Sequence, residues 1–193
     1  GTKYTTSTSQ AIRKWAGTAL PSVYGSFGSN LRWKDLSLSM LMTYSLGGKT
    51  MDGSYRSLMS TGSASSAAAL HKDVLNSWNG APDGMTATSP NRIDPNGTPI
   101  LDFNGSNDNN AVSDRWLTSS SYFIMKNIML TYRLPKALVT KWGLGGISVK
   151  AGVENLFTLT SRKGLNPQYS FNGDSDDTYV SARVFNFGLT VDL

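Results

Sequence analysis

Apolar and polar residues alternate with a period of two in five stretches of the chain. Such alternation is typical of strands that present one apolar face and one polar face. In the third stretch, SYFIMKNIMLTYRLP, the even positions are nearly all apolar, and Pro135 ends ladder pairing. The pattern predicts an all-β chain whose antiparallel strands run over residues 21–33, 36–46, 121–134, 147–157 and 185–193.

The connections between these strands alternate between short and long. Lys34 and Asp35 form a two-residue turn, and residues 136–144 form a short connection with one helical turn that ends at Gly143. The other two connections, residues 49–118 and 159–178, are long and rich in loop-forming residues. In an antiparallel sheet this order places the long connections at one end and the short ones at the other.

The longest connection contains one predicted helix, over residues 65–78, which Asn79 and Gly80 end. Its apolar side consists of Leu70, Val74, Leu75 and Trp78. His71, the single histidine, lies off that side, so we expect a solvated residue rather than a catalytic one. The sequence holds no Ser/His/Asp arrangement, metal-binding helix or phosphate loop, and we expect no enzyme activity and no cofactor.

The predicted strands are long enough to cross a bilayer. The alternation predicts that Tyr122 and Tyr132, ten residues apart, share one face of the strand. A separation of ten residues spans roughly 25 Å in a tilted strand. An apolar band of that height, flanked by aromatic girdles, is typical of a transmembrane β-barrel. The alternative is a secreted soluble β-sandwich whose apolar faces form a core. Lys126 falls on the apolar face and predicts a bulge or a polar partner there.

Five strands do not close a membrane barrel, which needs about eight. An open sheet in lipid would leave unpaired backbone groups at its edges. The chain is therefore predicted to be a mature or internal piece of a longer barrel protein, and neither a signal peptide nor a transmembrane helix is visible in it.

Composition supports a sheet with an uncharged polar face. Charged residues make up 16% of the chain, against about 25% in soluble domains. The net charge of +5 comes from single basic residues rather than a cluster, which argues against nucleic-acid binding. The absence of cysteine excludes disulfides and thiolate metal sites.

Two groups in the long connection are candidates for binding. Asp102, Asn104 and Asp108 place oxygen ligands at alternate positions, as a calcium loop does, but the glycine and the last acidic residue of such a loop are missing. A flexible polar loop is the alternative. Trp78 and Trp116 are candidate platforms for a solute or for a lid, and packing of the loop on itself is the alternative.

Several motifs resemble the C-terminal part of SusC/RagA-type TonB-linked outer-membrane transporters. SYFIMKNIMLTYRLP and VKAGVENLFTLTSRKGLNP resemble two successive strands of that family with the loop that follows them. LPSVYGSFGSNLRWKDLSLSMLMTYSLGGK resembles a hairpin of the family, and FNFGLTVDL its closing strand. Asn166 replaces a usual aspartate, Ser26 a usual glycine, and Leu193 stands where many barrels end in an aromatic residue.

The resemblance implies an antiparallel transmembrane β-barrel in the bacterial outer membrane, of which this chain supplies the last five of 22 strands. Residues 1–20 would belong to an extracellular loop and residues 21–193 to the barrel, with connections 49–118 and 159–178 outside the cell and no plug domain in this chain. Aromatic residues at the two membrane interfaces would be Trp33, Tyr132 and Trp142 on the inner side and Tyr44, Tyr122, Phe157 and Tyr179 on the outer side.

The implied function is energised uptake of oligosaccharides or peptides. The implied partners are a SusD-like surface lipoprotein, outer-membrane lipid, and TonB acting through the missing N-terminal part. A passive porin is a further alternative, which the absence of a plug in the parent protein would favour.

Overall fold

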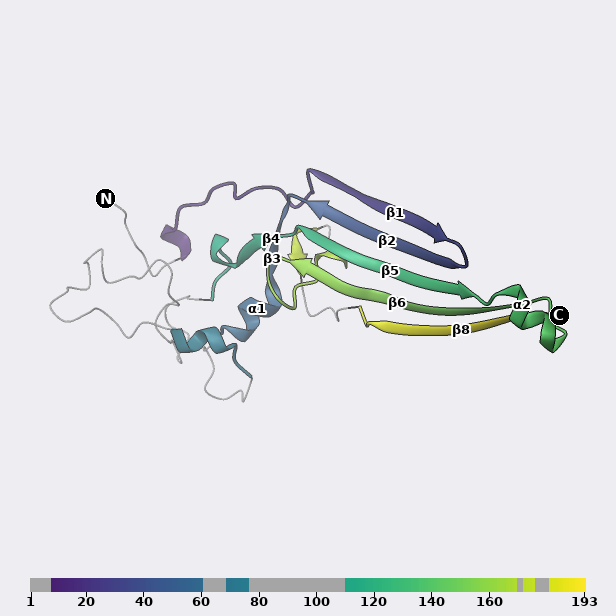
Figure 1. Cartoon of the computed structure of the whole chain (residues 1–193). Coiled ribbons are helices and arrows are strands. Elements are labelled where there is room, and N and C mark those ends of the chain that lie inside the picture. Colours follow the sequence, from purple (N-terminus) through teal and green to yellow (C-terminus); the bar gives the residue numbers. More distant parts are fainter. Residues whose placement is uncertain (1–7, 61–68, 77–109, 170–171, 176–180) are drawn as a thin grey trace. The chain divides into compact units, whose positions relative to one another are not determined.

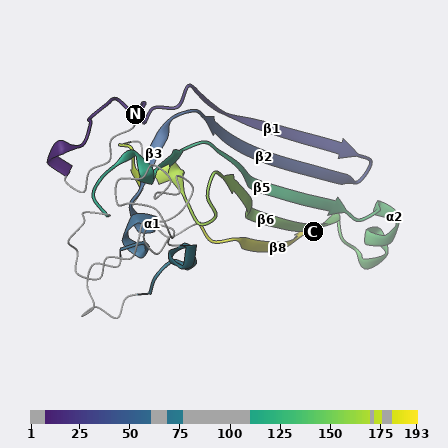
Figure 2. The same ribbon diagram turned by 90° about the vertical axis from the view of Figure 1, so that its left-hand side faces the viewer.

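The computed structural model describes residues 8–60, 69–76, 110–169, 172–175 and 181–193. The chain divides into two compact units. The larger consists of Gly17–Thr50 and Thr118–Leu193, and the smaller of Gly1–Ala16 and Met51–Leu117. The larger unit contains a five-stranded antiparallel sheet (Figures 1 and 2).

The strands of this sheet lie in the order β1-β2-β5-β6-β8. Every pair of neighbours is antiparallel. The bounds are β1 (Val23–Trp33), β2 (Leu36–Leu46), β5 (Tyr122–Arg133), β6 (Gly146–Thr160) and β8 (Val184–Asp192). These five strands confirm the strand predictions, except that β6 continues to Thr160 and so shortens the predicted connection 159–178.

Both short connections lie at one end of the sheet, here called the turn end. The chain reverses at Lys34, whose φ of 53° is left-handed, as the first position of a tight hairpin requires. Between β5 and β6 lie α2 (Lys136–Val139) and η5 (Thr140–Trp142), followed by Gly143 with φ of 73°. This confirms the predicted helical turn. The C-terminus lies at the same end (Figure 1), where Gly145 donates to the carbonyl of Asp192.

The opposite end of the sheet, here called the loop end, carries the long connections. The turn that leaves β2 uses Gly47 and Gly48, with φ of 85° and 76°. A Cβ on Gly48 would lie 2.6 Å from Oγ of Ser120 and 2.8 Å from the carbonyl oxygen of Ala19, so a side chain does not fit there. The described elements of these connections are β3 (Lys49–Asp52), β4 (Leu117–Ser119), β7 (Asp174–Ser175), which pair in the order β4-β3-β7, and η6 (Pro167–Tyr169).

The smaller unit contains short helical segments around a small apolar core. Its described elements are η1 (Thr8–Gln10), α1 (Gly53–Leu58), η2 (Lys72–Asn76) and η4 (Asp114–Trp116). Met59, Val74 and Trp116 form the core, with Met51 and Tyr55 packed against it. No helix in the described part of the chain is both long enough and apolar enough to cross a membrane.

The helix predicted over residues 65–78 lies partly outside the described residues. Within its described part, residues 72–76 form the short 3-10 helix η2 rather than an α-helix with one apolar side. Val74 is buried, whereas Leu75 is 90% exposed and Leu70 is also exposed. Leu70 precedes η2, so the short helix does not bring it onto one side with Val74 and Leu75.

Candidate functional site: the two faces of the five-stranded sheet

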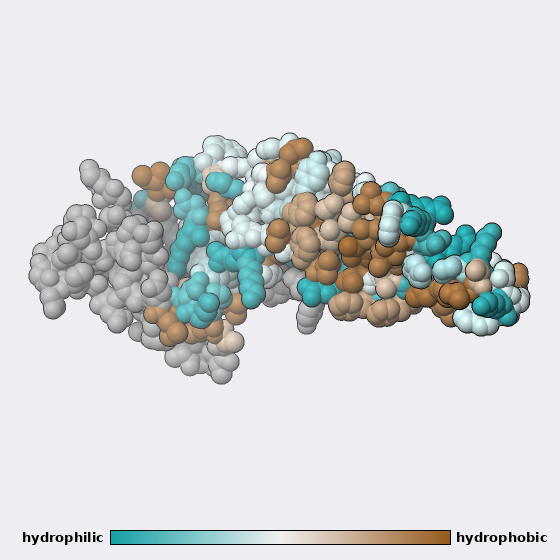
Figure 3. All heavy atoms as spheres, in the orientation of Figure 1, coloured by the Kyte–Doolittle hydropathy of each residue, from teal (hydrophilic) through white to brown (hydrophobic). Residues whose placement is uncertain are grey.

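The register divides the side chains of the sheet into an apolar face and a polar face. The apolar face is continuous across all five strands, because residues paired across neighbouring strands point to the same side. One row across it joins Leu31, Leu38, Leu130, Ala151 and Phe187. Figure 3 shows hydrophobic residues gathered over the strands of this sheet.

Large apolar side chains of this face are exposed rather than packed in a core. Phe187 is 82% exposed, and Phe27, Leu31, Phe185 and Leu189 are each more than half exposed. Soluble monomers rarely leave an apolar patch of more than a few hundred Å² uncovered. The face therefore has the character of a surface that meets an apolar environment.

Charged side chains avoid the apolar face completely. The five strands contain six charged residues; the register places five of them on the polar face, and the sixth, Lys126, lies at a bulge where it has no paired counterpart. They are Arg32, Lys126, Arg133, Lys150, Glu154 and Asp192. Serine, threonine, asparagine and glycine occupy most of the remaining polar-face positions. One face thus suits lipid and the other suits water.

Lys126 lies at a bulge in β5, as the sequence predicts. Met125 pairs with Met42 and Asn127 with Leu41, so Lys126 has no counterpart in β2. Against β6, the register shifts at the same point, and Asn155 of β6 has φ of 50°. The bulge turns Lys126 to the polar face beside Asn127. There its ammonium donates to the side-chain carbonyl of Gln168, so both predicted outcomes, a bulge and a polar partner, are confirmed.

The bulge also corrects the predicted faces of β5. Because the alternation reverses at Lys126, Tyr122 and Ile124 lie on the polar face and not with Ile128 and Tyr132. Phe123 takes the place that the sequence predicted for Tyr122. It pairs with Tyr44 and Leu159, and its ring stacks on Phe157 with the centroids 6.2 Å apart. Strict alternation assigned Tyr122 and Phe123 to the wrong faces. The signal for the reversal was Lys126, a charged residue inside an apolar run.

The loop after β6 contacts this bulge through Gln168. Leu165, Asn166 and Pro167 are buried, and Oδ1 of Asn166 accepts from Nε2 of Gln168 at 3.0 Å. Asn166 stands where the SusC/RagA-type transporters that the motifs resemble usually have an aspartate. Its hydrogen bond orients the side-chain amide of Gln168, which accepts from Lys126. The GLNP motif (residues 164–167) therefore has a structural role, because it holds the loop against the bulge.

Five of the seven predicted interface aromatics lie toward the two ends of the sheet, whereas Tyr122 lies on the polar face. Trp33, Tyr132 and Trp142 lie at the turn end and are exposed. Tyr44 lies near the loop end of the apolar face, and Phe157 is on the same face. Tyr179 lies outside the described residues.

Trp116 does not present an open platform. Its side chain is 1% exposed, it packs in the core of the smaller unit, and its indole N–H donates to the carbonyl of Ala111 at 2.9 Å. Arg115 lies over its ring at 4.5 Å, and burial lowers the pKa of that guanidinium. The described structure therefore favours the alternative reading, packing of the loop on itself. Trp78 lies outside the described residues.

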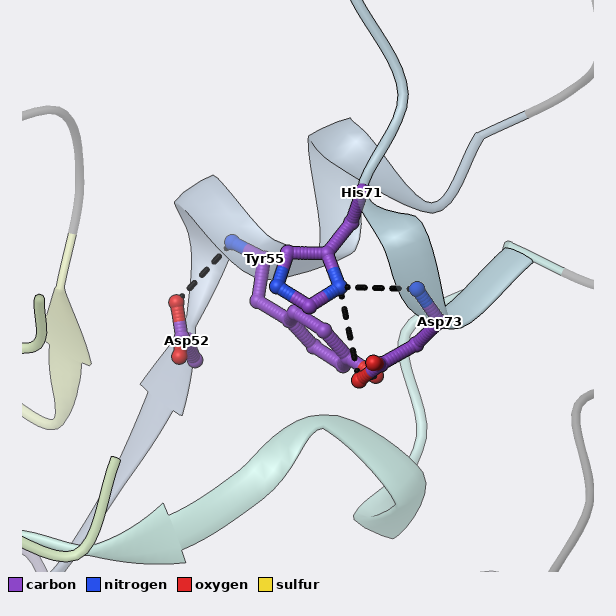
Figure 4. A network of polar contacts seen from close by, with 4 residues as sticks. All are labelled: Asp52, Tyr55, His71 and Asp73. Carbon is purple, nitrogen blue, oxygen red and sulfur yellow. Dashed lines mark hydrogen bonds and ion pairs between the residues drawn. The ribbon is translucent and has the colours of Figure 1, made fainter. Parts of the chain in front are cut away.

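His71 belongs to a polar network and is not simply solvated, which corrects the prediction. Its Nδ1 accepts from the backbone N–H of Asp73 at 3.2 Å and lies 3.3 Å from the carboxylate of that residue (Figure 4). The hydroxyl of Tyr55 donates to the same carboxylate at 2.9 Å, and the rings of Tyr55 and His71 meet edge to face. Asp52 accepts from the N–H of Tyr55 and caps α1. The network ties α1 to η2.

The metal candidates Asp102, Asn104 and Asp108 lie outside the described residues. In the part of the chain that the structure describes, no three histidine or acidic side chains converge on a point that could hold an ion.

The chain is similar in sequence to two TonB-dependent receptors. No family model matches the chain. TonB-dependent receptor P3 of Formosa agariphila is 25% identical over 194 residues, which cover 95% of this chain and 17% of the receptor. TonB-dependent receptor P39 of the same organism is 21% identical over 168 residues, which cover 82% of this chain and 14% of the receptor.

The chain resembles TonB-dependent receptors along nearly its whole length. The similarity extends to the fold. The RagAB peptide importer in the closed-closed state matches 93% of this chain and 18% of the solved chain, with a TM-score of 0.70 and 22% identity. The open-open state matches with a TM-score of 0.66. The resemblance predicted from the motifs is confirmed, and the chain spans less than a fifth of each relative.

Proposed function

We propose that this chain forms the last five strands of a 22-stranded outer-membrane barrel that imports bulky solutes in a TonB-dependent way. The observation that carries the proposal is the apolar face, which is continuous over five strands, exposed and free of charge. In a barrel wall that face meets lipid and the polar face meets the lumen. The resemblance to TonB-dependent receptors supports the same assignment.

Both edges of the sheet support a place inside a larger barrel. In the described order β1 and β8 are the outer strands, and each has a neighbour on one side only. Unpaired backbone groups in lipid cost several kcal/mol each. In the proposed barrel β1 and β8 pair with strands of the remaining protein, which removes both edges.

A secreted soluble β-sandwich is the competing function, and the same face counts against it. A sandwich covers its apolar face with a second sheet of comparable size. Among the described strands the other sheet consists of β4, β3 and β7, of which the longest has four residues. A passive porin would have the same strands in this chain. It would differ from an importer in that the full protein would have no plug domain.

The partners follow from the proposed family. The solved neighbours are structures of RagAB, a peptide importer or transporter. By analogy we assign this chain a SusD-like lipoprotein at the loop end, TonB acting on a plug elsewhere in the protein, and oligosaccharides or peptides as cargo. The turn end faces the periplasm, with Trp33, Tyr132 and Trp142 at the inner interface and Tyr44, Phe123, Phe157 and Tyr179 at the outer one.

Spin labels on β8 test the proposal in the intact protein. The chain has no cysteine, so single cysteines in it label specifically once any others in the protein are replaced. Labels at Phe185, Phe187 and Leu189 are compared with labels at Asn186 and Thr190. A lipid-facing label collides with oxygen more than with a water-soluble nickel chelate, and a lumenal label does the opposite.

The proposal requires this accessibility to alternate residue by residue along β8 in liposomes. A sandwich core would shield the labels at Phe185, Phe187 and Leu189 from both reagents. That result, together with a protein that stays monomeric without detergent, would reject the barrel.

A further inference from the structure

The polar face carries a shallow hollow near the turn end. Its volume is about 230 Å³, below the roughly 300–1,000 Å³ of pockets that enclose a whole drug-sized ligand. It therefore fits one functional group rather than a complete solute. Ser37 and Ser39 of β2 form its floor, and its borders are Asn30 and Arg32 of β1 and Met129 and Thr131 of β5.

The hollow stays open because Met129 lies over a glycine of the next strand. Met129 pairs with Gly152 of β6. A Cβ on Gly152 would lie 2.7 Å from Cε and 2.8 Å from Sδ of Met129, so the methionine occupies the space that a side chain at position 152 would fill. Met129 thus extends toward β6, and Ser39 on the other side remains exposed.

The polar side chains of the lining can all donate hydrogen bonds, none of the lining residues is a carboxylate, and Leu31, Leu38 and Met129 complete the lining. Three hydroxyls, one amide and one guanidinium line the space. The only polar contact of the Arg32 side chain within the described residues is from Nε to the carbonyl of Lys34 at 3.5 Å, which leaves its two terminal nitrogens for a ligand. An arginine fork binds planar oxyanions through two parallel hydrogen bonds.

The surrounding charge also favours an anion. The polar face carries four cations and two carboxylates, and both carboxylates are engaged. Glu154 accepts from Asn186 at 3.0 Å, and Asp192 lies 3.9 Å from Arg133. Lys150 pairs with Thr131 across β5 and β6 and adds a second cation near the hollow.

We propose that this hollow is a binding site for one oxyanion, a carboxylate or sulfate group, with Arg32 as its main ligand. The site rests on the geometry of the sheet and does not depend on the proposed transport function. The oxyanion has two possible sources, an anionic group on a solute or an acidic side chain elsewhere in the intact protein.

Calorimetric titration of the purified intact protein with glucuronate tests the first source, with glucose as the neutral probe. We expect millimolar binding of glucuronate and none of glucose. Arg32→Gln should weaken glucuronate binding at least tenfold, because it removes the fork and the charge. The matched control Arg183→Gln removes an exposed arginine outside the hollow and should leave binding unchanged.

Gly152→Ala should also weaken glucuronate binding, because the added methyl group pushes Met129 toward Ser39 without changing any charge.

Thermal melting of the same variants tests the second source. If the protein supplies the oxyanion itself, the wild type takes up no glucuronate, while Arg32→Gln melts several degrees below Arg183→Gln. Either pattern supports the site and identifies its source. The proposal is overturned if Arg32→Gln and Arg183→Gln agree in both binding and melting, or if glucose binds as tightly as glucuronate. Neither readout depends on membrane insertion, so failure here is distinguishable from failure of the barrel.

Discussion

The ammonium of Lys126 in β5 donates a hydrogen bond to the side-chain carbonyl of Gln168, which follows 42 residues later in η6. This contact joins the bulge that reverses the faces of β5 to the buried loop after β6. It also explains how a lysine occurs within an apolar run, because the bulge turns the charge away from the apolar face.

Deletion of Lys126 should remove the bulge without exchanging the faces of β5. Met125 and Asn127 pair with the consecutive residues Met42 and Leu41 of β2, so the shortened strand alternates strictly and keeps Phe123 and Met125 on the apolar face. Lys126→Gln keeps the bulge, and both variants lose the charged hydrogen bond to Gln168, worth about 1.5–3 kcal/mol. The fraction of folded barrel, measured by heat-modifiable migration in gels, should be similar for the two variants. A collapse of the folded fraction for the deletion alone would contradict this register.

Arginine scanning should separate the two faces of β8. Phe187→Arg places a charge on the apolar face and should cost about 2–4 kcal/mol if the site lies near the bilayer centre. Thr190→Arg lies on the polar face and should cost less than about 1 kcal/mol. The free energy of unfolding into denaturant from lipid vesicles measures both. A similar loss in the two variants would contradict the assignment of the faces.

Gly48→Ala should destabilise the larger unit more than Gly143→Ala. Both glycines have left-handed φ angles, of 76° and 73°, so both variants carry backbone strain of about 1 kcal/mol. Only at Gly48 does the added Cβ also meet neighbouring atoms, at 2.6 and 2.8 Å, whereas nothing lies within 4 Å at Gly143. Denaturant midpoints of the two variants provide the comparison, and a larger loss for Gly143→Ala would contradict the geometry.

Trp116→Ala should loosen the smaller unit. The indole is buried and donates to Ala111, and removal of a buried tryptophan costs about 3–5 kcal/mol. Hydrogen exchange of the amides of residues 53–60 should accelerate, while the strands of the larger unit keep their protection. Leu75→Ala, at a side chain that is 90% exposed, is the control and should change little.

Tyr55→Phe should weaken the network of Figure 4 without changing its packing. The variant removes the hydroxyl that donates to Asp73 at 2.9 Å and keeps the ring that contacts His71 and Trp116. We expect a loss of about 1.5–3 kcal/mol, as for a hydrogen bond to a charged group. Proteolysis between α1 and η2 should become faster, and an unchanged rate would show that the network does not hold the two segments together.

The sequence alone determined the five strands, their order of short and long connections, and an apolar face from which every charged residue except Lys126 is absent. These features are local, because a period of two places successive side chains on opposite faces of any strand. The helical turn before Gly143 was predictable for the same reason, since a left-handed residue ends a helix without distant contacts.

Only the tertiary structure decided what depends on residues far apart in the chain. The register at Lys126 comes from the pairing of β5 with β2 and β6, so the sequence could locate an anomaly but not assign Tyr122 and Phe123 to their faces. Trp116 and His71 acquired their roles through α1, η2 and a core that no periodicity encodes. The hollow at Arg32 exists because Met129 lies over Gly152, a contact that appears only when two strands are side by side.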